Sequence, residues 1–360
     1  VPISFMRSPR PTTAGLEALG IKPIPLFMLS AWIKAGAKCG FNVQNLFKEA
    51  GVKVDLIRME DARVSPLQLI SLLEQCAALT PPDKHFPFVL GDTFAFESLP
   101  EFETLLTTSP TLREALRVAD LARQVVLPWL KLEVREEREL AHVVVGLDVP
   151  LPNFEAYGLP LHLVTDAILA CIRKFGRTLQ GSEEGFVGVH IRRPAPAYAA
   201  QFEAFFGVPV SFGQPVDALV FERRILDAPL EGAFPALHEQ AQFLAEQRLG
   251  KEVKRQGVAA EIESLIARDP SLLALGVEEM ADRLTLHPRT LQRRLKDEGD
   301  TYLHVQARMR QRLACQWLKE GKLSIDDISA RLGFSDRRAF TAAFKRWEGL
   351  TPSAWRDREA

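Results

Sequence analysis

The sequence lacks the short motifs that mark common enzyme chemistries. It contains no GxSxG, HExxH or GxGxxG pattern and no Walker phosphate loop. Its seven histidines show no spacing typical of metal ligands. These absences predict a protein that is not an enzyme and has no catalytic residues, no metal site and no cofactor.

Cysteine is scarce, and long apolar runs are absent. The four cysteines, Cys39, Cys76, Cys171 and Cys315, form no CxxC pair, which predicts core thiols in a reducing compartment. No apolar run approaches the roughly 18 residues that span a bilayer. The first 24 residues also lack the apolar centre of a signal peptide and are expected to form a flexible tail. A cytoplasmic protein without a membrane partner follows.

Charge is almost balanced over the whole chain but divides unevenly along it. The 360 residues carry a net charge of −1, and 47% of them are apolar, enough for at least two domains with proper cores. Residues 251–360 hold 21 Lys and Arg against 17 Asp and Glu, a net of +4, so the remainder carries −5. This polarity suits nucleic-acid binding by the C-terminal part through specific contacts, since the basic field is mild.

The N-terminal two thirds of the chain has an α+β pattern. Helices are expected over most of 25–126, where Ser65-Pro66 and Ser109-Pro110 each place a capping serine before a proline at the first helical position. Leu130–Glu136 and His142–Asp148 alternate as a hairpin. The later elements expected are a helix over Leu159–Arg177, a strand over Phe186–Ile191, a helix over Ala197–Phe206, and strands over Val208–Phe212 and Ala218–Glu222. We therefore predict an effector-binding or dimerisation domain over 25–235 and a helical linker over 236–257.

Two polar groupings in this domain are candidate effector contacts. His162 and Asp166 lie four residues apart on an apolar helix, where they form either a ligand-facing pair or a buried pair with satisfied hydrogen bonds. His190 and Arg192, followed by Arg193, lie at a strand end, where they either hold an anion or form a solvated edge. Charged constellations are otherwise few, which favours a lipophilic effector such as a fatty acid or an aromatic compound.

The stretch from Leu323 to Arg356 predicts two short helices joined by a tight turn and closed by a third helix. Ser324 is expected to cap the first helix and Ser335 the second, with Gly333 in the turn between them. One face of the second helix is aromatic, and the other carries Arg337, Arg338, Thr341 and Lys345. A helix with this polar face suits insertion into a DNA major groove, although a solvated surface helix has the same pattern.

A second copy of the pattern lies upstream, over residues 276–299. Pro288 begins its second helix, where Leu291 and Leu295 face inward and Arg289, Gln292, Arg293 and Lys296 face outward. Arg pairs with guanine and Gln with adenine through two hydrogen bonds each. Tyr302–Glu320 is predicted to be one long helix that fixes the spacing of the two units, so that both meet successive major grooves.

Residues 258–360 resemble the DNA-binding module of the AraC/XylS family of bacterial transcription regulators. The residues that carry the resemblance are Gly333-Phe334-Ser335, Phe340, Phe344-Lys345-Arg346, Gly349, Thr351-Pro352 and Arg356. The resemblance implies that both recognition helices read DNA, with Lys345 and Arg346 on phosphates. Ala342 departs from the family, which is often basic there. Residues 190–230 resemble the end of the family's arabinose-binding-like effector domain, a label that does not make arabinose the ligand.

These features predict an α+β effector domain followed by an all-α tandem helix-turn-helix domain. Its function would be that of a one-component regulator whose partners are double-stranded promoter DNA, a small-molecule effector, RNA polymerase and a second copy in a homodimer. Two alternatives remain open from the sequence. One is a DNA-targeted repair enzyme that accepts alkyl groups on cysteine, and the other is a constitutive DNA binder whose N-terminal domain only dimerises.

Overall fold

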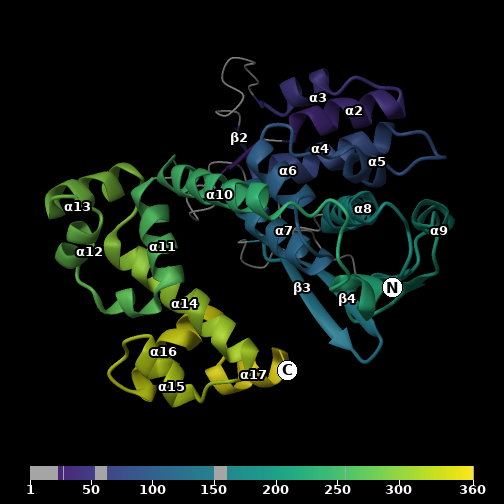
Figure 1. The fold of residues 1–360 in the computed structure, drawn as a ribbon. Coiled ribbons are helices and arrows are strands. Elements are labelled where there is room, and N and C mark those ends of the chain that lie inside the picture. Colours follow the sequence, from purple (N-terminus) through teal and green to yellow (C-terminus); the bar gives the residue numbers. More distant parts are fainter. Residues whose placement is uncertain (1–22, 27, 53–62, 150–159, 256, 360) are drawn as a thin grey trace, which may run out of the picture. The chain divides into compact units, whose positions relative to one another are not determined.

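A computed structural model describes residues 23–26, 28–52, 63–149, 160–255 and 257–359. The chain separates into two compact units, Val1–Leu249 and Gly250–Ala360, and the division falls within helix α10, Pro235–Arg255 (Figure 1). Most of the predicted tail, 1–24, lies outside the described residues. Its last residue, Ile24, is buried in a short strand.

Unit 1 is α+β, as predicted. Along the chain its elements are β1 (Ile24–Pro25), α2 (Leu29–Cys39), α3 (Gln44–Glu49), β2 (Arg63–Val64), α4 (Pro66–Leu79), α5 (Phe86–Thr93), α6 (Pro100–Thr107), α7 (Leu112–Val126), β3 (Leu130–Glu137), β4 (Leu140–Leu147), α8 (Leu161–Gln180), β5 (Phe186–Ile191), α9 (Ala200–Phe206), β6 (Val210–Phe212), β7 (Asp217–Glu222) and α10. Strands β1 and β2 pair on their own. The other five form one sheet.

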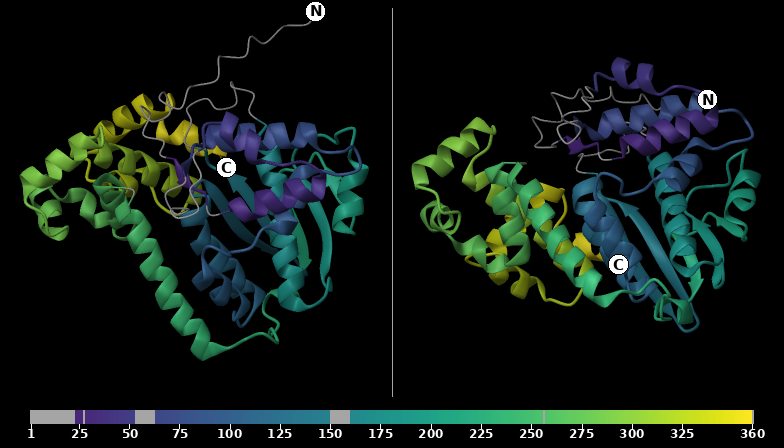
Figure 2. Two further views of the ribbon diagram at one scale, coloured as in Figure 1. Left: turned by 90° about the horizontal axis from the view of Figure 1, so that it is seen from above. Right: turned by 45° about the horizontal axis from the view of Figure 1, so that its top comes forward.

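The five-stranded sheet has the order β3-β4-β7-β5-β6. Its strands are the blue and teal arrows in Figure 2. The predicted hairpin is β3–β4, an antiparallel pair in which Leu132 lies opposite Val145. Only β5 and β6 run parallel, and helix α9 connects them. Strand β3 alternates between apolar residues that face the core and charged residues that face solvent, so one face of the sheet is built to be covered by helices.

Helices α7 and α8 both pack on the apolar face of this sheet, α7 against β3 and α8 against β4 and β7 (Figure 1). Helix α5 packs closely along α8, where Gly91 permits the approach because a Cβ there would lie 2.2 Å from the Ala167 carbonyl oxygen. Helix α7 also contacts α6, and a separate apolar cluster joins these two helices to Ala241 and Ala245 of α10. Helix α7 is therefore apolar on two sides.

The helix starts in unit 1 follow the predicted capping chemistry in one case and depart from it in another. Ser65 forms a complete capping box with Gln68 at the start of α4. The predicted cap at Ser109 is wrong, because α7 begins at Leu112 with Thr111 as its cap. The Ser109 hydroxyl instead donates to the Leu105 carbonyl at the end of α6.

Among its described residues, unit 2 contains helices and the turns between them, and no strand. Its elements are α11 (Val258–Arg268), a short 3-10 turn (Pro270–Ala274), α12 (Val277–Arg283), α13 (Pro288–Asp297), α14 (Tyr302–Glu320), α15 (Ile325–Arg331), α16 (Arg337–Glu348) and α17 (Pro352–Glu359). The long helix α14 has the predicted limits, and Gly321 ends it in the left-handed conformation. One continuous apolar core runs from Val258 to Trp355 and includes Met309 and Leu313 of α14.

Two arginines of α14 fix this helix to the elements around it. Arg308 donates to Glu263 of α11 at 2.7 Å and to Asp300 at 2.6 Å. Arg310 donates to the Leu332 carbonyl at 2.9 Å and to the Leu273 carbonyl at 3.2 Å. Leu332 lies at the end of α15, and Leu273 precedes α12. The Arg310 side chain therefore links the α15–α16 pair to the segment before the α12–α13 pair.

Among the described residues, no helix is both long enough and apolar enough to cross a lipid bilayer.

Candidate nucleic-acid interface and effector site

Helices α15 and α16 form a helix-turn-helix unit with an aromatic interior. Phe340 and Phe344 of α16 are fully buried, and the Phe344 ring lies 6.0 Å from that of Trp355 in α17. Gly333 takes φ +74° in the turn, a conformation that L side chains rarely adopt. The half-buried Phe334 ring then lies 5.4 Å from that of Phe340 and closes the corner between the helices.

The caps of this unit are partly as predicted. Ser324 caps α15 by accepting a hydrogen bond from the Asp327 amide, as expected. The predicted cap of α16 at Ser335 is wrong, since the Asp336 carboxylate accepts from the Ala339 amide at 2.8 Å instead. The recognition helix therefore begins at Arg337, with a carboxylate at its positive end.

The predicted DNA-facing residues of α16 lie together on its outer face. Arg337, Arg338, Lys345 and Arg346 are exposed, and Thr341 is half-buried. Arg337 is engaged by a neighbour, because its Nη1 donates to Asp326 of α15 at 3.1 Å.

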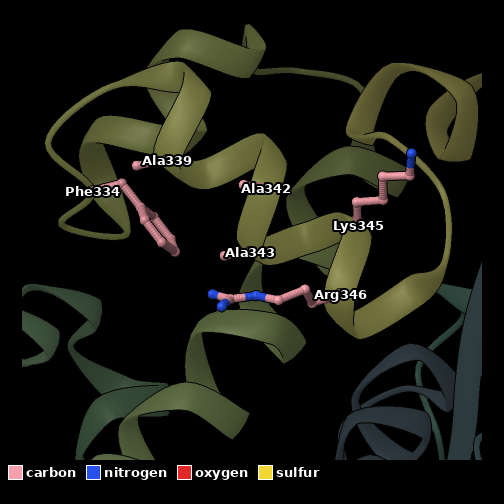
Figure 3. Close-up of a pocket in the computed structure, with 6 residues that line it drawn as sticks. All are labelled: Phe334, Ala339, Ala342, Ala343, Lys345 and Arg346. Atoms are coloured by element: carbon pink, nitrogen blue, oxygen red, sulfur yellow. The ribbon is translucent and has the colours of Figure 1, made fainter.

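Beside this face lies a shallow groove that the sequence did not indicate (Figure 3). It is lined by Phe334, Ala339, Ala342, Ala343, Lys345 and Arg346. Ala342 is exposed, so the position that departs from the family pattern leaves a methyl group on the outer face. Methyl groups of this kind contact the C5-methyl of thymine in the major groove.

Helices α12 and α13 form the other helix-turn-helix unit, with an aliphatic interior. Leu291 and Leu295 of α13 are buried against Met280 and Ala281 of α12. Pro288 occupies the first position of α13, as predicted, and the His287 ring accepts from the Arg289 amide at 3.3 Å.

The predicted readers of this unit share its outer face. Arg289, Gln292, Arg293 and Lys296 are all exposed. None of the four forms an ion pair or hydrogen bond with another described residue through its side chain, so all four are available to a ligand.

The two units are held at a fixed spacing by one core. Helix α14 is 19 residues long, which corresponds to about 28 Å at 1.5 Å per residue. It packs against α11 and against α15, α16 and α17. This length is close to the roughly 34 Å between successive major grooves on one side of DNA.

The polar pair predicted on α8 is not a pair in the structure. Asp166 is fully buried, and its carboxylate accepts from Arg193 at 2.8 Å and lies 2.8 Å from Nε2 of His85. The half-buried His162 is a separate neighbour, and burial is the main reason that its pKa is lowered. Sequence reasoning missed His85, because it lies 81 residues from Asp166 and no local pattern links them.

The other predicted effector residues lie near the end of β5. His190 is half-buried, and its ring centroid lies 5.3 Å from that of His142 on β4; burial and this neighbouring imidazole lower its pKa. The Arg192 side chain is exposed, while its backbone amide donates to Asp217 at 2.9 Å. The structure thus brings Arg193 to Asp166, whereas neither the His190 nor the Arg192 side chain forms a hydrogen bond or ion pair with them.

Unit 1 contains a large apolar cavity that sequence reasoning did not locate. It has a volume of about 180 Å³ and lies between α7 and α8, above Leu132, Val143 and Phe221 of the sheet. None of His162, Asp166, His190 and Arg192 lines it. A signal was present in the sequence, since Leu112, Leu116 and Ala119 form a second apolar stripe on α7 beyond the one that packs on α6.

Three of the four thiols are poor nucleophiles. Burial raises the pKa of Cys76 and of Cys171 to about 12, and it also raises the pKa of Cys39. A thiol reacts through its thiolate, so these groups are almost wholly unreactive at neutral pH. Within the described residues, no cluster of three or more His, Cys, Asp or Glu side chains is arranged to hold a metal ion.

Comparison with known proteins matches both units to described domains. A family model described as "Arabinose-binding domain of AraC transcription regulator, N-term" matches residues 40–230. A second model, described as "Helix-turn-helix domain", matches residues 280–358. The first match alone covers more than half of the chain.

Individual relatives match this chain over most of their own length. The chain is 26% identical to the ornithine utilization regulator of Pseudomonas aeruginosa, over 93% of this chain and 96% of that protein. It is 27% identical to the HTH-type transcriptional regulator VirS of Mycobacterium tuberculosis, over 82% and 85%. Among solved structures it is similar to the transcriptional regulator CdpR of Pseudomonas aeruginosa, at 23% identity and a TM-score of 0.41, over 88% of this chain and 96% of that one.

Proposed function

Because this chain belongs to the AraC family of transcription regulators, we propose that α13 and α16 read promoter DNA in two successive major grooves, under the control of an effector bound by unit 1. The observation that carries this proposal is the single core of unit 2. It holds two recognition helices on α14, and each presents a basic, solvent-exposed face.

The side chains divide between base reading and backbone contact. Arg289, Gln292 and Arg293 read bases in one groove, and Arg337, Arg338 and Thr341 read them in the other. Lys296, Lys345 and Arg346 bind phosphates. Each two-bond contact from Arg to guanine contributes about 1–3 kcal/mol of discrimination, whereas a phosphate contact contributes to all sequences alike.

The test is selection of binding sites from random DNA at one salt concentration. Arg293→Ala and Arg337→Ala should each relax base preference in its own half of the selected site. The loss is about 1–3 kcal/mol on the preferred site and much less on other DNA. Lys345→Ala should weaken all sequences and reduce the salt slope by about one unit.

Lys319→Ala provides the matched control, because Lys319 is an exposed cation of α14 outside both recognition helices. It should leave the selected site unchanged. If Arg293→Ala and Arg337→Ala alter the same bases, the two-groove arrangement is wrong. If Arg337→Ala weakens all sequences equally, α16 is an anchor and α13 alone reads the site.

We also propose that the protein is not an enzyme, in particular that it does not transfer alkyl groups from DNA. The raised pKa of Cys39, Cys76 and Cys171 supports this, since alkyl acceptance needs an accessible thiolate. Mass spectrometry after incubation with alkylated DNA should find no adduct on any cysteine. An adduct would establish the repair function instead.

Three further partners and settings complete the proposal. The regulator acts in the cytoplasm, where promoter DNA and RNA polymerase are found, and it contacts the polymerase when bound near a promoter. It also acts as a homodimer. Phe243 and Leu244 of α10, which are 61% and 53% exposed, offer an apolar surface to a second copy. Size-exclusion chromatography with light scattering should give twice the mass of one chain. A monomer at all concentrations would exclude the dimer.

A further inference from the structure

We infer that the cavity between α7 and α8 is the effector site and that it binds a neutral, largely hydrocarbon molecule about the size of a substituted benzene. The inference rests on the proposed function, in which unit 1 senses a small molecule. An apolar cavity of about 150 Å³ in another protein holds benzene, so the 180 Å³ here suits a ligand slightly larger than benzene.

The cavity lies where two apolar helices cover one sheet without closing the space between them. From α7, the wall includes Leu112, Leu116 and Ala119, and from α8 it includes Ile168 and Phe175. Each of these helices packs on the sheet and on other helices. The stripes that face each other therefore remain unfilled, and a hydrocarbon ligand would supply the missing contacts.

The chemistry of the walls excludes a sugar. The cavity has one charged side chain in its wall, Arg123, whose Nε donates to Asp120 and whose Nη1 donates to the Pro128 carbonyl at 3.3 Å. The Cys171 thiol also lines the cavity. A sugar would lose water from several hydroxyl groups and find almost no replacement partners, at a cost of roughly 1–3 kcal/mol for each. An anionic ligand would find one cation, Arg123, which is already paired with Asp120.

The same walls link the cavity to the last helix of unit 1. Leu106, Ala115 and Val126 border the cavity and also belong to the apolar cluster that holds Ala241 and Ala245 of α10. A ligand that pushes on α7 therefore alters the surface on which α10 rests. This gives the ligand different contacts in two arrangements of α7 and α10, which is the requirement for control by binding.

Two glycines line the cavity, and only one of them can be replaced by a larger residue without a clash. At Gly91 an added Cβ would lie 2.2 Å from a backbone oxygen of α8, so substitution there disrupts helix packing. At Gly176 of α8 an added Cβ meets no atom within 4 Å. Gly176→Phe therefore fills space, and Gly176→Ala is its matched control, which should also favour the helix.

The experiment is isothermal titration calorimetry on the full chain with three compounds. Ethylbenzene is the neutral probe, 4-ethylbenzoate is its charged analogue and arabinose is the sugar. We expect ethylbenzene to bind at least tenfold more tightly than 4-ethylbenzoate, and arabinose to give no heat. Gly176→Phe should weaken ethylbenzene binding at least tenfold, and Gly176→Ala should change it less than threefold.

Arg192→Ala separates this site from the polar one. It should leave ethylbenzene binding unchanged. Tighter binding of 4-ethylbenzoate that is lost in Arg192→Ala, or binding of arabinose, would overturn the inference. If Gly176→Phe does not fold, as judged by circular dichroism, Ala119→Phe fills the cavity from α7 and is held to the same tenfold loss.

Ethylbenzene binding and DNA-site selection test the cavity and the regulator function separately. Specific DNA binding is measured in the same preparations. No ethylbenzene binding by a protein that still selects a DNA site overturns the cavity assignment alone. A protein that binds ethylbenzene but selects no DNA site keeps the cavity as a ligand site and overturns the regulator mechanism.

Discussion

The two recognition helices differ in what holds them and in what they leave free. Helix α16 rests on the rings of Phe340 and Phe344, whereas α13 rests on Leu291 and Leu295. The turn before α16 contains a glycine at φ +74°, but the turn before α13 contains Thr285 at φ +55°. In α16 the first arginine is paired with Asp326, while the arginines on the outer face of α13 have no partner among the described residues.

This difference indicates that the second unit has the more firmly built interior and that its first arginine must leave Asp326 before it binds a ligand. Aromatic pairs add about 0.5–1.5 kcal/mol each beyond their buried area. A threonine at positive φ stores strain that a glycine avoids. The two copies of one motif therefore differ in the packing of their interiors and in the strain of their turns.

The largest expected effect concerns the interiors. Phe344→Ala should lower the free energy of unfolding of unit 2 by about 3–5 kcal/mol, because it removes a fully buried ring that contacts the Phe340 and Trp355 rings. Leu295→Ala should cost about 2–5 kcal/mol and less than Phe344→Ala. Denaturant unfolding of both variants measures the difference. A larger loss in Leu295→Ala would reverse the order of the two units.

Substitutions in the two turns should change the stability of unit 2 by an intermediate amount and in opposite directions. Gly333→Ala should destabilise unit 2 by about 1–2 kcal/mol, because it forces an L side chain into the left-handed region. Thr285→Gly should stabilise it by up to about 1 kcal/mol by relieving strain, less the backbone entropy that glycine adds to the unfolded chain. Thermal melts of the two variants should shift in opposite directions. Equal losses in both would show that Thr285 is unstrained.

The smallest effect concerns the engaged arginine. Asp326→Asn should free Arg337 and raise DNA affinity by roughly 0.2–1 kcal/mol, since both members of the pair are exposed. Asp297→Asn removes the same charge from α13, where no ion pair is formed with a described residue, and serves as the control. A gain in Asp326→Asn that exceeds the control supports release of Arg337. Equal gains would mean that only net charge matters.

The sequence predicted the elements whose signals are local. The limits of α14 were predicted to the residue, because Met309, Leu313 and Trp317 form a continuous apolar stripe and Gly321 ends it. Strand β5 was also predicted with its observed limits, since its six residues are bounded by polar and glycine-rich segments. The family matches confirm the α+β and helix-turn-helix assignments.

The caps could not be predicted where two suitable residues lie close together. Ser335 and Asp336 are adjacent and both able to cap, and the structure selects Asp336, whose backbone is extended. Similarly, Thr111 rather than Ser109 caps α7. Which residue is selected depends on the path of the incoming chain, which follows from tertiary packing.

Partners far apart in sequence were also beyond prediction. Asp166 is satisfied by His85 and Arg193, which come from two other parts of the fold. The cavity is the extreme case, because it depends on the separation of α7 and α8 over the sheet. Sequence periodicity shows which faces are apolar, but not whether two such faces touch.

The unfilled space in unit 1 also bears on the lifetime of the protein. The hydrocarbon side chains that line this space lack packing partners on one side until a ligand fills it. A ligand present at a hundred times its dissociation constant returns about 2.7 kcal/mol to the folded state. Copies without a ligand therefore open more often and meet proteases sooner. The cellular abundance of the regulator would then follow the supply of its ligand, so that the same cavity sets both how active the protein is and how long it lasts.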